Sequence, residues 1–154
     1  IKGRAVDKYV AEQGEFLRKK LQSMIMKNPD IVNKQSDDIV YVISPFKNVA
    51  YQLSKELNKI GFTRYDKNSK PTNVGTVHTF QGKEAPIVFL VLGADEKCIG
   101  AANWAMGTEN PNIMNVAATR AKNELYIIGD KKMYLSLNSD VINDTYRIIK
   151  KHML

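Results

Sequence analysis

Two short segments of this chain combine residue types that suit phosphate chemistry. Residues 81–84 read Gln-Gly-Lys-Glu, and residues 115–121 read Asn-Val-Ala-Ala-Thr-Arg-Ala. Gly82 permits a close approach of the backbone, and its N–H can face a phosphate. Glu84 would repel a triphosphate, so we expect it to accept hydrogen bonds from ribose hydroxyls. The plainer interpretation of the first segment is a polar turn with an exposed glutamate.

Arg120 is the second candidate for this chemistry. On a helix, Ile113, Val116, Ala117 and Arg120 share one face by their spacing. A guanidinium is planar, permanently charged and able to grip a phosphate with two donors. During phosphoryl transfer such a group offsets the charge that builds on the γ-phosphate. The alternative is an arginine that snorkels past an apolar stripe or pairs with a nearby carboxylate.

A third segment, residues 43–47, reads Ile-Ser-Pro-Phe-Lys and follows an apolar run. Ser44 is able to donate a hydrogen bond to a phosphate, and Lys47 supplies a positive charge. Pro45 breaks the run, and Phe46 either packs in the core or stacks on a base. The segment therefore predicts a nucleic-acid contact or, equally well, a proline that ends a strand beside a core phenylalanine.

Hydrophobic periodicity predicts the elements that position these segments. Apolar runs without polar alternation indicate strands that are buried on both faces. We expect helices at 5–27, 48–60 and 112–122 and after 130, strands at 39–43, 74–80, 87–92 and 125–128, a short strand within 61–73, and a long loop at 93–111. Strands that alternate with helices predict an α/β domain with a mostly parallel sheet covered by helices on both faces.

This order of elements also predicts where the polar turn lies. In open α/β sheets, ligands bind beyond the carboxyl ends of the strands. With a strand at 74–80, Gln81, Gly82 and Glu84 are expected at such an end.

Composition sets broad limits. The 154 residues suit one domain spanning 1–154, and the formal net charge of +7 suits a polyanionic partner. The longest apolar run is too short for a membrane helix. Cys98 is the only cysteine, which excludes an internal disulfide and fits an intracellular, cytoplasmic setting. His78 has no companion ligands nearby in sequence, so we expect no metal site.

The pairing of Gln-Gly-x-Glu with Asn-Val-Ala-x-Thr-Arg-Ala resembles motifs V and VI of superfamily 1 DNA and RNA helicases. Within this superfamily the segments resemble the nonsense-mediated-decay and Dna-type group, in the second, C-terminal RecA-like domain of these enzymes. The resemblance implies a RecA-like three-layer fold. It also implies that Gln81, Gly82, Glu84 and Arg120 contact a nucleotide, with Arg120 catalytic.

The same resemblance assigns a nucleic-acid track. Residues 43–47 resemble motif IV, and Thr76 and His78 match positions near the nucleic-acid backbone. The implied activity is ATP-dependent movement along single-stranded DNA or RNA. The implied nucleic-acid-binding residues are Ser44, Pro45, Phe46, Lys47, Thr76 and His78.

Some parts of such an enzyme are missing from this sequence. It contains no Gly-x-x-x-x-Gly-Lys-Ser/Thr segment and no strand ending in Asp-Glu. We therefore expect an excised half, inactive alone, whose N-terminal RecA-like partner domain carries the ligands for Mg²⁺ and the other half of the ATP site. The rival interpretations are a helicase subunit of a recombination nuclease and a non-catalytic nucleic-acid-binding RecA-like domain.

Trp104 falls in the predicted loop at 93–111. An exposed indole is able to stack on a base, but anchoring the loop to the protein surface is the interpretation we favour for this side chain.

Overall fold

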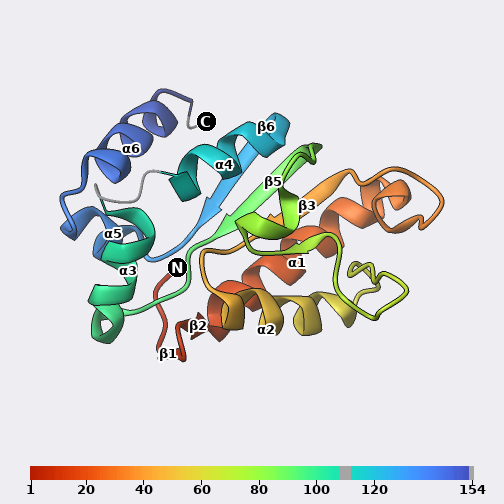
Figure 1. Ribbon diagram of the computed structural model, residues 1–154, viewed down its shortest axis with the longest axis horizontal. Helices are drawn as coiled ribbons and strands as arrows, with labels where there is room; N and C mark the ends of the chain where they lie inside the picture. Colours follow the sequence, from red (N-terminus) through yellow and green to blue (C-terminus); the bar gives the residue numbers. More distant parts are fainter. Residues whose placement is uncertain (108–111, 153–154) are drawn as a thin grey trace.

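The computed structural model describes residues 1–107 and 112–152. It has a four-stranded parallel sheet in the order β4-β3-β5-β6, with helices on both sides (Figure 1). The strands are β3 (Val40–Ile43), β4 (Val74–Gly75), β5 (Ala85–Val91) and β6 (Ala121–Ile128). The predicted α/β class with a parallel sheet is confirmed.

The two central strands form the core of the sheet. Every residue of β3 is buried, and β5 is buried from Val88 onward. Continuous apolar runs were the basis for predicting these strands, and both are present. On one face Tyr41 packs against Phe80, with ring centroids 4.5 Å apart. On the other face Phe89 stacks on Tyr126 at 5.0 Å.

Two helices pack against each other along one side of the sheet, α1 (Ala11–Lys27) and α2 (Lys47–Asn58) (Figure 1). Helix α2 buries Val49, Leu53 and Leu57, which recur every four residues along one face. Between the helices, Arg18 Nε donates to Glu56 Oε1 at 2.8 Å.

The second half of the chain supplies the remaining helices. They are α3 (Ile99–Met106), α4 (Asn112–Arg120), α5 (Lys131–Ser136) and α6 (Asp140–His152). Helix α4 packs on β5 and β6 and contacts the 3-10 helix Val77–Phe80, called η2. Among the described residues, no helix is both long and apolar enough to cross a membrane.

The start of the predicted helix 5–27 is wrong. Its first residues instead form an antiparallel hairpin of β1 (Ala5–Val6) and β2 (Tyr9–Val10). Asp7 and Lys8 between them have φ angles of 45° and 68°, as a tight two-residue hairpin turn requires. Helical spacing of the apolar residues concealed the turn because Val6, Tyr9 and Val10 suit either structure.

The predicted strand 74–80 is also wrong after its second residue. The chain leaves the sheet at Thr76, and Val77–Phe80 coil into η2, with the Thr79 N–H donating to the Thr76 carbonyl at 3.0 Å. This turn carries Phe80 into the core, where it is fully buried.

Two predicted loops differ in content. Within 61–73 no strand is assigned, and Tyr65 and Pro71 make only an isolated bridge. Within 93–111 the described residues form the 3-10 helix Glu96–Cys98 and α3. The remainder of that predicted loop, 108–111, lies outside the described residues.

Candidate functional site

The register of the sheet divides the candidate residues between its two edges. Ala85 pairs with Ala121 and Ile43 with Gly75, so the amino ends of β5 and β6 share one edge and the carboxyl ends of β3 and β4 share the other. Residues 81–84 directly precede β5 and therefore lie at the amino edge. Their predicted position at a carboxyl end is wrong because η2 turns the chain back across the sheet.

The amino edge carries a tight turn at residues 80–83. The Lys83 N–H donates to the Phe80 carbonyl at 3.0 Å. Gln81 has φ −58° and ψ 122°, and Gly82 has φ +74°. These angles define a type II turn, in which the third position favours glycine. The turn geometry therefore accounts for Gly82, and it leaves the side chains of Gln81, Lys83 and Glu84 exposed.

Arg120 ends α4 beside this turn. Its Nη1 lies 3.4 Å from the Phe80 carbonyl oxygen and 3.3 Å from that of Lys83. Its Nε is buried without a hydrogen-bond partner. The structure thus brings together the two sequence segments that predicted phosphate chemistry. Both hydrogen bonds of Arg120 are long and come from Nη1, so the side chain is held beside the 80–83 turn by weak contacts.

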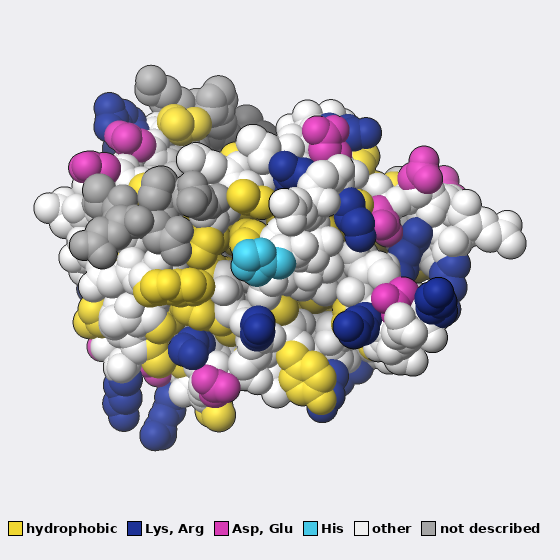
Figure 2. Space-filling model, in the orientation of Figure 1, with side chains coloured by type: hydrophobic (Ala, Val, Ile, Leu, Met, Phe, Trp, Pro, Cys, Tyr) yellow, Lys and Arg dark blue, Asp and Glu magenta, His cyan; other side chains and the backbone are white. Residues whose placement is uncertain are grey.

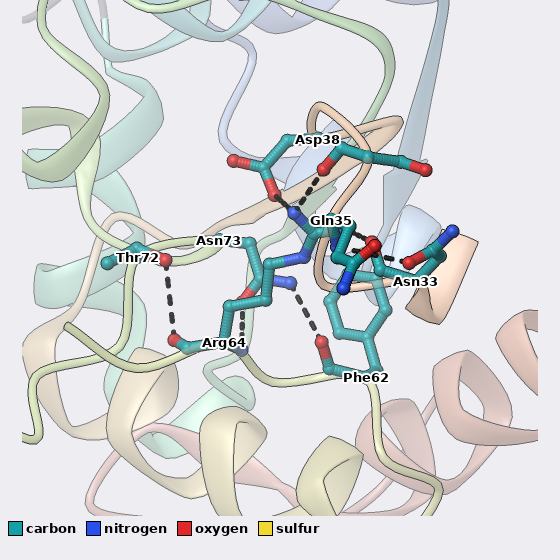
Figure 3. A network of polar contacts seen from close by, with 8 residues as sticks. Asn33, Gln35, Asp38, Phe62, Arg64, Thr72 and Asn73 are labelled. Carbon is teal, nitrogen blue, oxygen red and sulfur yellow. Dashed lines mark hydrogen bonds and ion pairs between the residues drawn. The ribbon is translucent and has the colours of Figure 1, made fainter. Parts of the chain in front are cut away.

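A polar cluster around Arg64 supports the same edge (Figure 3). The guanidinium donates to the Ser36 and Asn33 carbonyls at 2.8 and 2.7 Å and lies 3.3 Å from Asp38. Burial raises the pKa of Asp38 above its ordinary value, and the positive charges of Arg64 and Lys83 only partly oppose that effect. Because Asp38 precedes β3, this cluster fixes the loop beside the 80–83 turn.

The carboxyl edge carries a groove of about 890 Å³. Five of the six residues predicted to bind nucleic acid line it: Pro45, Phe46, Lys47, Thr76 and His78. Figure 2 shows hydrophobic side chains gathered on this face beside α3, with Lys and Arg side chains around them. The groove begins where β3 and β4 end, which is the edge where ligands of open α/β sheets bind.

The sixth residue, Ser44, lies beneath the groove. Its side chain is fully buried, and its hydroxyl accepts a hydrogen bond from the Phe46 N–H at 3.3 Å. In this conformation Ser44 shapes the turn into α2 and does not reach the groove. Phe46 is 6% exposed, so of the two functions considered for it, packing in the core describes its position better than stacking on a base.

Two further groove residues were not among the six predicted to bind nucleic acid. Lys8 reaches the groove from the hairpin turn, and Trp104 reaches it from α3. Lys8 lies within the predicted helix 5–27, and Trp104 was interpreted as a loop anchor in preference to a base-stacking residue. The sequence carried only a weak signal for this turn, because Lys8 stands where a two-residue hairpin turn usually has glycine.

Comparison with known families agrees with this architecture. A family model described as an AAA domain matches residues 6–132, which include both edges of the sheet. The chain belongs to this AAA domain family. The AAA domain is of the nucleotide-binding, helicase-like type associated with superfamily 1. No curated protein matches the chain.

Every sequence-predicted site residue falls within the matched AAA-domain region. The structure places Gln81, Gly82, Glu84 and Arg120 together at the amino edge. It places the motif IV residues with Thr76 and His78 at the carboxyl edge. The two edges are separated by the length of β5, roughly 20 Å at 3.3 Å per residue.

Proposed function

We propose that this AAA domain is the second RecA-like half of an ATP-dependent superfamily 1 helicase of the nonsense-mediated-decay and Dna-type group. In this proposal the intact enzyme moves along single-stranded DNA or RNA. The observation that carries it is the position of Arg120 against the carbonyls of Phe80 and Lys83. Arg120 and the 80–83 turn are far apart in sequence, and their contact brings the segments that resemble motifs V and VI together.

The amino edge is proposed to meet a nucleotide held mainly by an N-terminal RecA-like partner domain. The rule that ligands bind at carboxyl ends concerns ligands held by the sheet itself. A domain that lends side chains to a nucleotide bound elsewhere is free to use its other edge. In this proposal the partner domain binds Mg²⁺ together with ATP, and the ion would offset phosphate charge there. The 81–84 turn is not proposed to hold the ion, because no cluster of carboxylates accompanies Glu84 in it.

Three residues at this edge, Glu84, Arg120 and Gly82, have distinct proposed roles. Glu84 accepts hydrogen bonds from the ribose. Arg120 leaves its long bonds to the Phe80 and Lys83 carbonyls and stabilises charge on the γ-phosphate during transfer. The backbone of the turn at Gly82 approaches the phosphates.

The carboxyl-edge groove is proposed to hold the nucleic-acid backbone. Helix α2 begins there at Lys47, and no side chain caps its amino end. Its first N–H groups and its dipole favour an anion at that place. Thr76 and His78 face the same groove.

The test uses an intact parent protein containing both RecA-like domains. We expect Arg120→Ala to lower kcat by about 10³-fold while strand affinity stays within about twofold, because an arginine that meets developing charge acts mainly on the transition state. Arg120→Lys should restore little activity, since an ammonium lacks the forked donors. Glu84→Gln should mainly raise KM.

Arg147→Ala, which removes an exposed arginine on α6, is the matched control and should leave kcat unchanged. Thermal melting must accompany every assay, because Arg120 also holds the 80–83 turn. A folded Arg120→Ala enzyme that hydrolyses ATP at the parental rate contradicts the proposal.

A further inference from the structure

One corner of the carboxyl-edge groove brings together Lys8 and Trp104, two residues to which none of the motifs assigns a function. The Phe46 ring lies between them: the Lys8 ammonium is 5.5 Å from its centroid, and the Trp104 ring centroid is 6.0 Å away. Lys8 comes from the β1–β2 hairpin and Trp104 from α3. Segments from three separate parts of the chain therefore meet at this corner.

Trp104 is the accessible aromatic ring of the pair. It is 56% exposed, whereas Phe46 is 6% exposed. The two rings are tilted by 33°, and the buried Phe46 packs beside the indole. Stacking on a base, which the sequence offered to both Phe46 and Trp104, is thus available at Trp104, on a helix that borders the groove.

The hairpin holds Lys8 in place by several contacts. Asn48 Nδ2 donates to the Asp7 carbonyl at 2.9 Å, and the Ala94 N–H donates to the Lys8 carbonyl at 2.6 Å. Gly93 leaves room for this contact, because a Cβ there would lie 2.5 Å from the Lys8 oxygen.

Asp7 and Lys8 both have positive φ, which costs roughly 1 kcal/mol or more for a residue with a side chain. Strained backbone that surrounding contacts maintain is a reason to look for a function.

The charge of this corner favours an anion. Lys8 and the exposed Lys47 both line the groove, and the amino end of α2 opens into it. Asp7 lies 3.6 Å from the Lys8 ammonium and balances part of its charge. An aromatic ring beside lysines at a groove is the combination that binds unpaired bases and their phosphates.

We propose that Trp104 and Lys8 grip a single-stranded nucleic acid, with a base stacked on the indole and the adjoining phosphate paired with the ammonium. This inference rests on the proposed nucleic-acid function of the groove and adds two residues to it. A base inside a duplex has both faces covered, so the corner selects single strands over duplexes.

The chain offers a direct probe, because Trp104 is its only tryptophan. Titration with a 15-nucleotide oligodeoxythymidine at low salt should quench the tryptophan fluorescence, as should oligouridine. An abasic strand of the same length, or a duplex, should bind more weakly and leave the fluorescence nearly unchanged. The DNA and RNA strands together show which sugar the groove prefers.

Variants separate the two contributions, with binding followed by anisotropy of a labelled strand. Trp104→Ala should weaken binding of the normal strand about tenfold and binding of the abasic strand little, whereas Trp104→Phe should retain part of the affinity. Lys8→Asn should weaken binding to both strands and reduce the slope of log affinity against log salt by about 0.7. Asparagine tolerates positive φ, so Lys8→Asn should fold at least as well as the original chain.

Lys59→Asn, at the far end of α2, removes the same charge away from the groove and should change affinity less than Lys8→Asn. Suppose that the original chain binds single strands but neither the Trp104 nor the Lys8 variants differ from it, or the fluorescence does not change. The proposed contacts of Trp104 and Lys8 with the strand are then wrong, while the proposed function stands. If the original chain binds no single strand even at low salt, the nucleic-acid part of the proposed function fails with it.

Discussion

At the scale of single residues, Gly82 shows how local geometry and proposed chemistry coincide. Its φ of +74° completes the type II turn, and nothing lies within 4 Å of the place where a Cβ would be. Space therefore does not limit a substitution there, but backbone conformation does. We expect Gly82→Ala to lower the free energy of unfolding by about 1 kcal/mol.

Urea denaturation measures this effect, and Gly100→Ala is its matched control. Gly100 lies in α3 with nothing near its missing Cβ and without a positive φ, so alanine there should raise stability by about 0.5–1 kcal/mol. Equal effects of the two substitutions would contradict the assigned turn. Gly82→Asn should be milder than Gly82→Ala, since asparagine tolerates positive φ.

The sequence predicted part of the candidate site at this scale. Residue types and spacing selected Arg120 and the 81–84 segment, and the structure brings them together. Spacing did not reveal Lys8, because its position depends on contacts with Asn48 and Ala94. Nor did it reveal that Ser44 is buried, since a hydroxyl after a strand suits either a turn or a ligand.

At the scale of elements, the contact between α1 and α2 has a predictable pH dependence. Glu56 accepts from Lys59 and from Arg18, and these hydrogen bonds hold its pKa below the ordinary value of 4.5. A carboxyl group with a lowered pKa stabilises the fold above that ordinary value, and the contribution is lost as the pH falls through the folded-state pKa. Glu56→Gln should therefore cost about 1 kcal/mol at pH 7 and progressively less as the pH falls below 4.5.

Urea midpoints of both proteins at several pH values measure the difference. Glu15→Gln is the control, because Glu15 pairs with Lys19 in an exposed pair within α1 and should matter less. A stability difference for Glu56→Gln that persists unchanged at pH 3 would show that the charge of this carboxylate is not its source.

Elements were predicted well where tertiary contacts agree with local pattern. The strands β3 and β5 and the helix α2 follow from their apolar spacing. The strand predicted at 74–80 failed because burial of Phe80 against Tyr41 favours a 3-10 turn over extension of the sheet. Residues 74–80 also lack the continuous apolar runs of β3 and β5, because their large apolar residues, Val74, Val77 and Phe80, are three apart.

At the scale of the whole molecule, the sequence lacks a phosphate-binding loop of the Walker type. We expect the 154-residue chain alone to release no phosphate from ATP, with or without single-stranded nucleic acid. Adding a separately purified partner RecA-like domain should produce turnover that requires Arg120. Sustained hydrolysis that copurifies with this chain alone would contradict its assignment as one half of a site.

The segment of residues 76–84 touches both candidate sites. Thr76 and His78 line the carboxyl-edge groove, Gln81 and Glu84 lie at the amino edge, and the buried Phe80 is fixed between them. Under the proposed function this segment couples the two sites, because one of its ends contacts the nucleotide and the other contacts the strand. Because binding linkage is reciprocal, strand binding should change nucleotide affinity by the same factor by which nucleotide binding changes strand affinity. Occupation of the groove would then be communicated to the ATP site through this one segment.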